Sequence, residues 1–97
     1  MTENATIALS TTVRQSNNQI AAELDGDVVL MSVDEGKFYN LIDIASEVWA
    51  RLEHPMTVEA LCDALAREFD ASIDTVRVDV IALLDDLYRG KLIEIAA

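Results

Sequence analysis

The stretch Gly36 to Leu52, GKFYNLIDIASEVWARL, changes its hydrophobic period part-way along. Residue types from Lys37 to Ile42 favour a pleated strand, whereas Ile44, Val48 and their apolar neighbours recur at helical spacing. The change falls at Asp43, whose carboxylate can accept hydrogen bonds from the first amides of a helix. We therefore expect a strand that runs directly into a helix capped by Asp43.

The residues ahead of this stretch predict a three-stranded antiparallel meander. Ile20 to Leu24 alternates like a strand, and Asp25-Gly26 then supplies a tight hairpin turn. Val28 to Val33 is apolar on both faces apart from one serine, as suits a central strand. The third strand, Lys37 to Ile42, is then expected at an edge of the sheet.

The N-terminal segment carries a weaker pattern. Residues 1–12 are expected to form a flexible arm, because their first part is mostly polar and has little to anchor it. Ile7, Leu9 and Val13 alternate loosely with serine and threonine, which permits either a short edge strand or an extended arm.

The residues after the stretch predict two further helices. Thr57 is a favourable cap for the second helix, and the third is expected from Ile73 to Arg89, closed by Gly90. Lys91 to Ile95 reads as an extended tail. The fold class is therefore α+β, with an N-terminal three-stranded antiparallel sheet followed by three helices in a single domain, residues 1–97.

The apolar positions of the third helix span an arc of roughly 160°, wider than the roughly 100° of a one-sided core stripe. Arg77 falls inside this arc, so it must snorkel or meet a polar partner at the rim. Three explanations stay open: burial on more than one face, a groove between this helix and the edge strand, or a homodimer contact. The arc consists of Ile73, Val76, Val80, Ile81, Leu83, Leu84, Leu87 and Tyr88.

Charge narrows the choice of partner. The chain has 18 acidic and 7 basic residues, a formal net charge of −11, which repels phosphate backbones and anionic membrane surfaces. We therefore expect a peptide or protein partner, no nucleic acid and no membrane. No apolar run is long enough to cross a bilayer, no secretory signal is visible, and the lone Cys62 suits a cytoplasmic location.

Enzyme chemistry finds little support in the sequence. His54 is the one histidine and Cys62 the one cysteine, far apart in the predicted elements, so neither a metal cluster nor a catalytic pair is indicated. The three glycines have turn or cap positions, and no phosphate-binding loop is present. We expect a protein without catalysis, metal or cofactor.

The predicted edge strand is open to a guest peptide. Edge strands are usually protected by proline or by several charged residues. Lys37 to Ile42 contains no proline and only one charged residue. Such an edge permits β-augmentation, in which an extended peptide adds a strand through backbone hydrogen bonds.

These pieces together resemble the PqqD-like family of precursor-peptide recognition elements of ribosomally synthesised and post-translationally modified peptides (RiPPs), and in particular the stand-alone leader-binding proteins of lasso-peptide biosynthesis. The resemblance covers roughly Ile20 to Ile95 and includes GKFYNLIDIASEVWARLEHPMTVEALCDALAREF and DVIALLDDLYRGKLI. Ile42 departs from the pattern, since the family commonly has asparagine or aspartate before the helix. Its most specific pieces are Gly36, Phe38, Tyr39 and Leu41, Val48-Trp49, Thr57-Val58, and Asp79-Val80 with Leu84, Leu87, Gly90 and Leu92.

The resemblance implies a non-catalytic, winged-helix-turn-helix-like domain that binds the leader of a precursor peptide, often with a Tyr-x-x-Pro element. It also implies delivery to a leader peptidase, a transglutaminase-like cysteine protease. Tyr39, Leu41, Val80 and Leu84 fit the core as well as the groove, and Asp79 could pair with a basic leader residue. The implied binding residues are Lys37, Phe38, Tyr39, Asn40 and Leu41 on the strand, and Val76, Arg77, Asp79, Val80 and Leu84 on the helix.

Other classes of function stay open. A winged-helix transcription regulator would share the expected topology, but acidic residues outnumber basic ones on its third helix. Another acidic protein–protein interaction module is a further alternative. An acyl carrier would suit the size and acidity, but such domains are all-helical and need an Asp-Ser-Leu attachment site, which the chain lacks.

Overall fold

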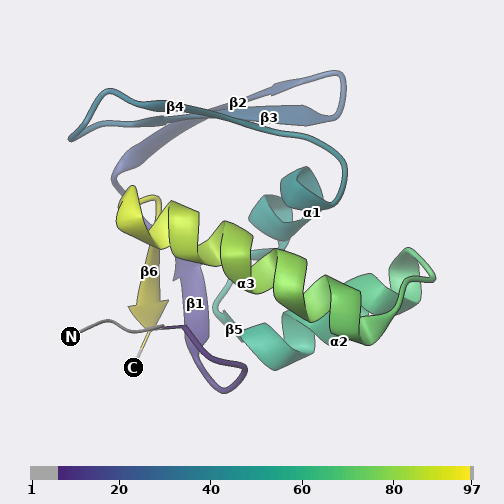
Figure 1. Ribbon diagram of the computed structural model, residues 1–97. Helices are drawn as coiled ribbons and strands as arrows, with labels where there is room; N and C mark the ends of the chain where they lie inside the picture. The colour runs from purple at the N-terminus through teal and green to yellow at the C-terminus, as the bar shows by residue number, and fades with distance from the viewer. Residues whose placement is uncertain (1–6, 97) are drawn as a thin grey trace.

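The computed structural model describes residues 7–96 and contains two small antiparallel sheets and three helices. One sheet has the strand order β2-β3-β4 and the other the order β5-β1-β6. In Figure 1, α3 crosses the middle of the molecule between the β2-β3-β4 sheet and the strands β1 and β6. The strands are β1 (Thr12–Gln15), β2 (Gln19–Leu24), β3 (Asp27–Ser32), β4 (Phe38–Leu41), β5 (Met56–Thr57) and β6 (Ile93–Ala96), and the helices are α1 (Ile44–Arg51), α2 (Val58–Glu68) and α3 (Ile73–Arg89). The predicted α+β class is confirmed.

The meander of β2, β3 and β4 forms as the sequence predicts. Leu24 pairs with Asp27, which leaves Asp25 and Gly26 as a two-residue loop. Both loop residues have positive φ, 54° and 88°, as a tight hairpin turn of this hand requires. Among the described residues β4 pairs with β3 alone, so the prediction of β4 as an edge strand is confirmed.

The second sheet is absent from the sequence prediction. Val13 was expected in an edge strand or an extended arm, yet β1 lies between β5 and β6 and the Val13 side chain is fully buried. The expected C-terminal tail is the strand β6, with Ile95 opposite Val13. Short strands from opposite ends of the chain carry too little local alternation to reveal such a pairing.

The expected flexible arm of residues 1–12 lies partly outside the described residues, which begin at Ile7. Within the described part, Ile7 is buried and Thr12 begins β1. Leu9 accepts a backbone hydrogen bond from Glu59, and Thr11 accepts one from Val58. The segment that precedes β1 is therefore held against the start of α2.

Helix ends show one confirmed cap and two corrections. Thr57 Oγ1 accepts a hydrogen bond of 3.1 Å from Ala60 N, as predicted. Asp43 precedes α1, but at φ 52° and ψ −125° its carboxylate makes no bond to the first turn. Gly90 follows α3 with an ordinary φ of −82°, and the left-handed residue is Lys91 at φ 63°. Gly90 is therefore not needed there for a left-handed cap.

The core collects apolar side chains from the three helices and both sheets. In α3 these are Val76, Val80, Leu84 and Leu87, one stripe at helical spacing. The other buried members are Val13, Val28, Leu30, Leu41, Val48, Trp49, Leu52, Val58, Leu61, Cys62, Leu65, Leu92 and Ile93, together with Ile7. Of the described helices, none is both long enough and apolar enough to span a bilayer.

Replacing Thr57 by alanine should lower the free energy of unfolding by about 1 kcal/mol, because the Ala60 amide loses its partner. Urea denaturation followed by circular dichroism measures this loss. Thr57→Ser is the matched control and should keep most of the stability, since it retains the hydroxyl. Equal losses in both variants would contradict a capping role for Thr57 Oγ1.

Candidate peptide-binding groove

A groove runs along one flank of α3, opposite Tyr39 of β4 and the start of α1. It consists of two adjoining hollows that share Leu83, of about 240 Å³ and about 320 Å³. The first is lined by Ile42, Asp43, Ile44, Ala45, Asp79, Val80 and Leu83. The second is lined by Glu35, Lys37, Tyr39, Leu83, Asp86, Leu87, Arg89 and Gly90. An apolar floor with charged residues at both ends suits a peptide better than a small polar substrate.

The flank of α3 that faces β4 is a stripe next to the core stripe. Asp79, Leu83, Asp86 and Gly90 follow one another at intervals of four, three and four residues, the spacing that places side chains on one helix face. Leu83 is half-buried between the two hollows. Part of the wide apolar arc of this helix therefore faces the groove as well as the core.

The Tyr39 side chain of β4 packs against Gly90 at the end of α3. A β-carbon built on Gly90 would lie 2.9 Å from Tyr39 Cζ and still closer to Tyr39 Oη. Only a residue without a side chain allows the phenol to occupy this position. This contact explains the glycine, which the backbone conformation alone does not require.

The backbone of β4 presents its free hydrogen-bonding groups at Phe38 and Asn40. Ser32 N donates to Lys37 O at 2.9 Å, and the register continues with Met31 opposite Phe38 and Leu30 opposite Tyr39. Antiparallel pairs alternate between bonded and non-bonded, so Tyr39 bonds to β3 and its two neighbours direct their amides to the free edge. A guest strand would meet the N–H and C=O groups of Phe38 and Asn40.

The structure brings four of the predicted site residues together at the groove: Lys37, Tyr39, Asp79 and Val80. Phe38 and Asn40 turn their side chains to the opposite face of the sheet. The other four lie elsewhere: Leu41, Val76 and Leu84 are core residues, and Arg77 is on the other flank of α3. The groove residues missed from the sequence are Glu35, Ile42, Asp43, Ile44, Ala45, Leu83, Asp86, Leu87, Arg89 and Gly90.

Arg77 lines a separate hollow of about 390 Å³ with Ile7, Val78 and Ile81. Its Nε is buried and has no hydrogen-bond partner among the described residues.

Burial raises the pKa of the Cys62 thiol above its ordinary value. The nearby Arg77 charge acts against this increase in pKa, and the Asp63 charge adds to it. A buried thiol with a raised pKa is less reactive at neutral pH, which weighs against a nucleophilic role.

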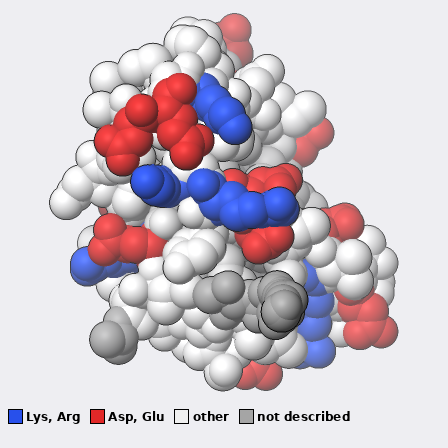
Figure 2. Space-filling view, turned by 60° about the vertical axis from the view of Figure 1, so that its left-hand side comes forward, with Lys and Arg blue, Asp and Glu red and all other residues white. Residues whose placement is uncertain are grey.

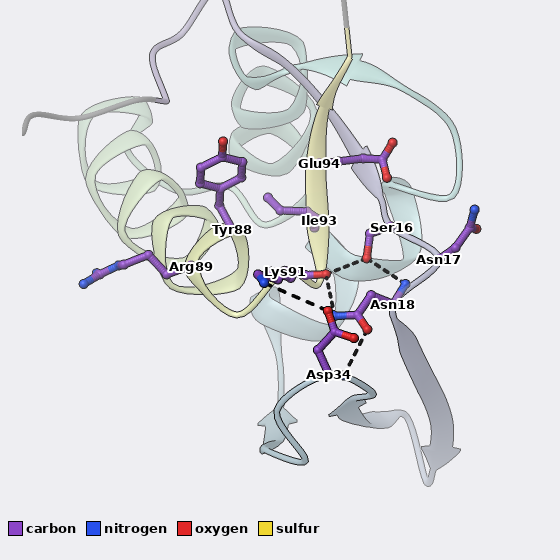
Figure 3. A pocket seen from close by; sticks show the side chains of 9 residues that line it. All are labelled: Ser16, Asn17, Asn18, Asp34, Tyr88, Arg89, Lys91, Ile93 and Glu94. Atoms are coloured by element: carbon purple, nitrogen blue, oxygen red, sulfur yellow. Dashed lines mark hydrogen bonds and ion pairs between the residues drawn. The ribbon is translucent and has the colours of Figure 1, made fainter.

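Another hollow, of about 740 Å³, lies at the junction of the two sheets (Figure 3). Ser16 Oγ donates to Lys91 O at 2.7 Å and accepts from Asn18 N at 3.1 Å. Asn18 Oδ1 accepts from Asp34 N, and Lys91 Nζ lies 4.0 Å from Asp34 Oδ2. These polar groups bind one another, so we interpret this hollow as a structural joint.

Charge is distributed unevenly along the groove and around it. Figure 2 shows basic side chains in a band across the middle of one face, with acidic side chains on either side. Arg89 contacts Asp85 and Asp86 at 2.9 and 3.0 Å. By contrast, Asp43 and Asp79 have no ion-pair partner among residues 7–96, which leaves one end of the groove negative.

The family can now be assigned from comparison with known proteins. A model of the family described as coenzyme PQQ synthesis protein D (PqqD) matches residues 27–93. The chain belongs to the PqqD family. The resemblance predicted from the sequence is therefore confirmed. No curated protein sequence matches the chain.

Two solved structures share the fold of this PqqD-family chain. One is TbiB1 in complex with the TbiA(beta) leader peptide, with a TM-score of 0.77 and 28% identity over 87% of this chain and 98% of TbiB1. The other is the solution structure of the PqqD truncation of Methylobacterium extorquens PqqCD, described as a functional, stand-alone RiPP recognition element. Its TM-score is 0.75, at 18% identity over 93% of this chain and 96% of that one, which shows likeness of fold.

Gly90→Ala should lower the free energy of unfolding by about 1–3 kcal/mol, because an extra carbon is forced against the Tyr39 ring. Urea denaturation measures the loss. Tyr39→Phe removes the nearest atom, so Gly90→Ala should cost less in the Tyr39→Phe background than in the wild type. If Gly90→Ala lowers the free energy of unfolding equally in the wild type and in the Tyr39→Phe background, the Tyr39–Gly90 contact does not set the distance between β4 and α3.

Proposed function

We propose that this PqqD-family chain binds the leader region of a RiPP precursor peptide as an added strand at the free edge of β4. The observation that carries the proposal is the unpaired edge beside an apolar groove on α3. Backbone groups of Phe38 and Asn40 would bind the leader backbone, while alternate leader side chains enter the groove. The fold shared with TbiB1, which was solved with a leader peptide, supports this proposal.

The two hollows suit different leader side chains. Ile42, Val80 and Leu83 would contact apolar side chains, and a basic leader residue would pair with Asp79 or Asp43, which have no ion-pair partner in the described part of the chain. Lys37 would pair with an acidic leader side chain at the other end of the groove. We further propose a lasso-type precursor, in line with the sequence resemblance and the 28% identity to TbiB1.

The proposed role is delivery and not catalysis. A bound leader would be carried to a leader peptidase, expected to be a transglutaminase-like cysteine protease. Of the described residues, no group of three or more His, Cys, Asp and Glu side chains could hold a metal ion. A winged-helix transcription regulator is disfavoured because Arg89 on α3 is held by two aspartates and the net charge is −11.

Leu83→Asp should weaken leader binding at least about tenfold, because a charge replaces the apolar residue shared by both hollows. Fluorescence anisotropy with a labelled leader peptide measures the affinity. Val78→Asp is the matched control: it makes the same charge change on an exposed position at the other flank of α3. Equal affinities in the two variants would show that the groove beside β4 is not the binding site.

Asn40→Pro should also weaken leader binding at least about tenfold, because proline removes the backbone N–H that faces the free edge. The fold should be retained, since this backbone N–H makes no hydrogen bond to β3. The same anisotropy assay, with a thermal melt as the folding check, measures both effects. Asn40→Ala keeps the backbone N–H and should bind the leader like the wild type. If proline and alanine bind the leader equally well, strand addition at this edge is wrong.

A further inference from the structure

The face of the β2-β3-β4 sheet turned away from the helices is largely apolar. Val28, Leu30 and Ser32 of β3 are buried, so Val29 and Met31 lie on the opposite face. The register places Ile20, Met31 and Phe38 in one row across the three strands, and Ala22, Val29 and Asn40 in the next. We call this the outer sheet face, formed by Ile20, Ala22, Leu24, Val29, Met31 and Phe38.

The large side chains of the outer sheet face are open to solvent. Phe38 is 71% exposed, Leu24 62% and Ile20 58%. No element of residues 7–96 covers this face, and the helices lie on the other side of the sheet (Figure 1). A solvated face of an antiparallel sheet is normally polar, and a contiguous exposed apolar patch usually marks an interaction site.

Charged residues border the outer sheet face at both ends, and those at the hairpin end are acidic. The β2-β3 hairpin carries Asp25 and Asp27, which have no ion-pair partner among the described residues. The β3-β4 turn carries Asp34 and Glu35, which lie 4.0 Å from Lys91 and Lys37 respectively. The patch therefore has an apolar centre, a negative border at the hairpin end and a charge-paired border at the other end.

This charge pattern selects among possible occupants. Two stacked copies of the chain would bring a net charge of −11 against another −11. Anionic membranes and nucleic acids meet the same repulsion. A protein whose apolar surface is flanked by Lys or Arg is complementary in both respects.

We propose that the outer sheet face is the docking surface for the leader peptidase, through an apolar patch on that enzyme flanked by basic residues. The choice of enzyme rests on the proposed function. The Phe38 side chain lies on this face, whereas its backbone groups lie at the free edge. The enzyme would thus sit beside a bound leader without filling the groove.

The test uses the full chain, the leader peptidase as one probe and a labelled leader peptide as the other. The double variant Ile20→Ser/Leu24→Ser should weaken peptidase binding at least about tenfold, as loss of central apolar contacts does, and change leader affinity less than about twofold. Biolayer interferometry measures the first affinity and fluorescence anisotropy the second. Unchanged leader affinity also shows that the variant is folded.

The matched control is Phe69→Ser/Val78→Ser, which removes two exposed apolar side chains outside the outer sheet face. It should bind the peptidase like the wild type. Asp25→Asn/Asp27→Asn, which preserves residue types that tolerate the hairpin turn, should slow association and reduce its dependence on salt.

Three results would overturn the docking proposal: no peptidase binding by the wild type, equal losses in the serine variant and its control, or self-association in sedimentation that the serine variant abolishes. The last would assign the face to a homodimer. Failure of the wild type to bind any leader would instead contradict the proposed function, and it is read in the separate anisotropy assay.

Discussion

The Tyr39 side chain of the edge strand packs directly on Gly90 at the end of the third helix. The phenol lies where any β-carbon at position 90 would collide with it. The Tyr39 side chain therefore bridges strand β4 and the end of α3, and the two hollows lie along the same flank of α3, with Leu83 common to both. Leader binding as proposed depends on this spacing, because a guest strand at the edge of β4 must also reach the side chains of α3.

Helix α3 has three flanks, and each contacts a different part of the molecule. Its core stripe includes Val80 and Leu84, the stripe of Asp79 and Leu83 faces the groove, and Arg77 lies on the remaining flank. A helix packed between two sheets has to bury more than one side, which accounts for its wide apolar arc. The same arrangement leaves Asp79 on the groove flank without an ion-pair partner among the described residues.

The sequence by itself determined the elements whose causes are local. Turn chemistry at Asp25-Gly26 predicted the hairpin, the Thr57 hydroxyl predicted the start of α2, and helical spacing predicted α3 from Ile73 to Arg89. Strand-type residues followed by a helical period also predicted β4 as an edge strand leading into α1. Each of these features depends on backbone geometry within a few residues, which composition and spacing report directly.

Only the tertiary structure decided how those elements share their surfaces. Val13 lies in the central strand of a second sheet. The sequence does not reveal this position, because the partners of Val13 are Met56 in β5 and Ile95 in β6, both distant in the chain. Leu84 and Val76 went to the core, and Arg77 to the far flank of α3. Periodicity shows that a helix has an apolar face, but the direction of that face depends on which strands and helices pack against it, and those contacts join residues distant in sequence.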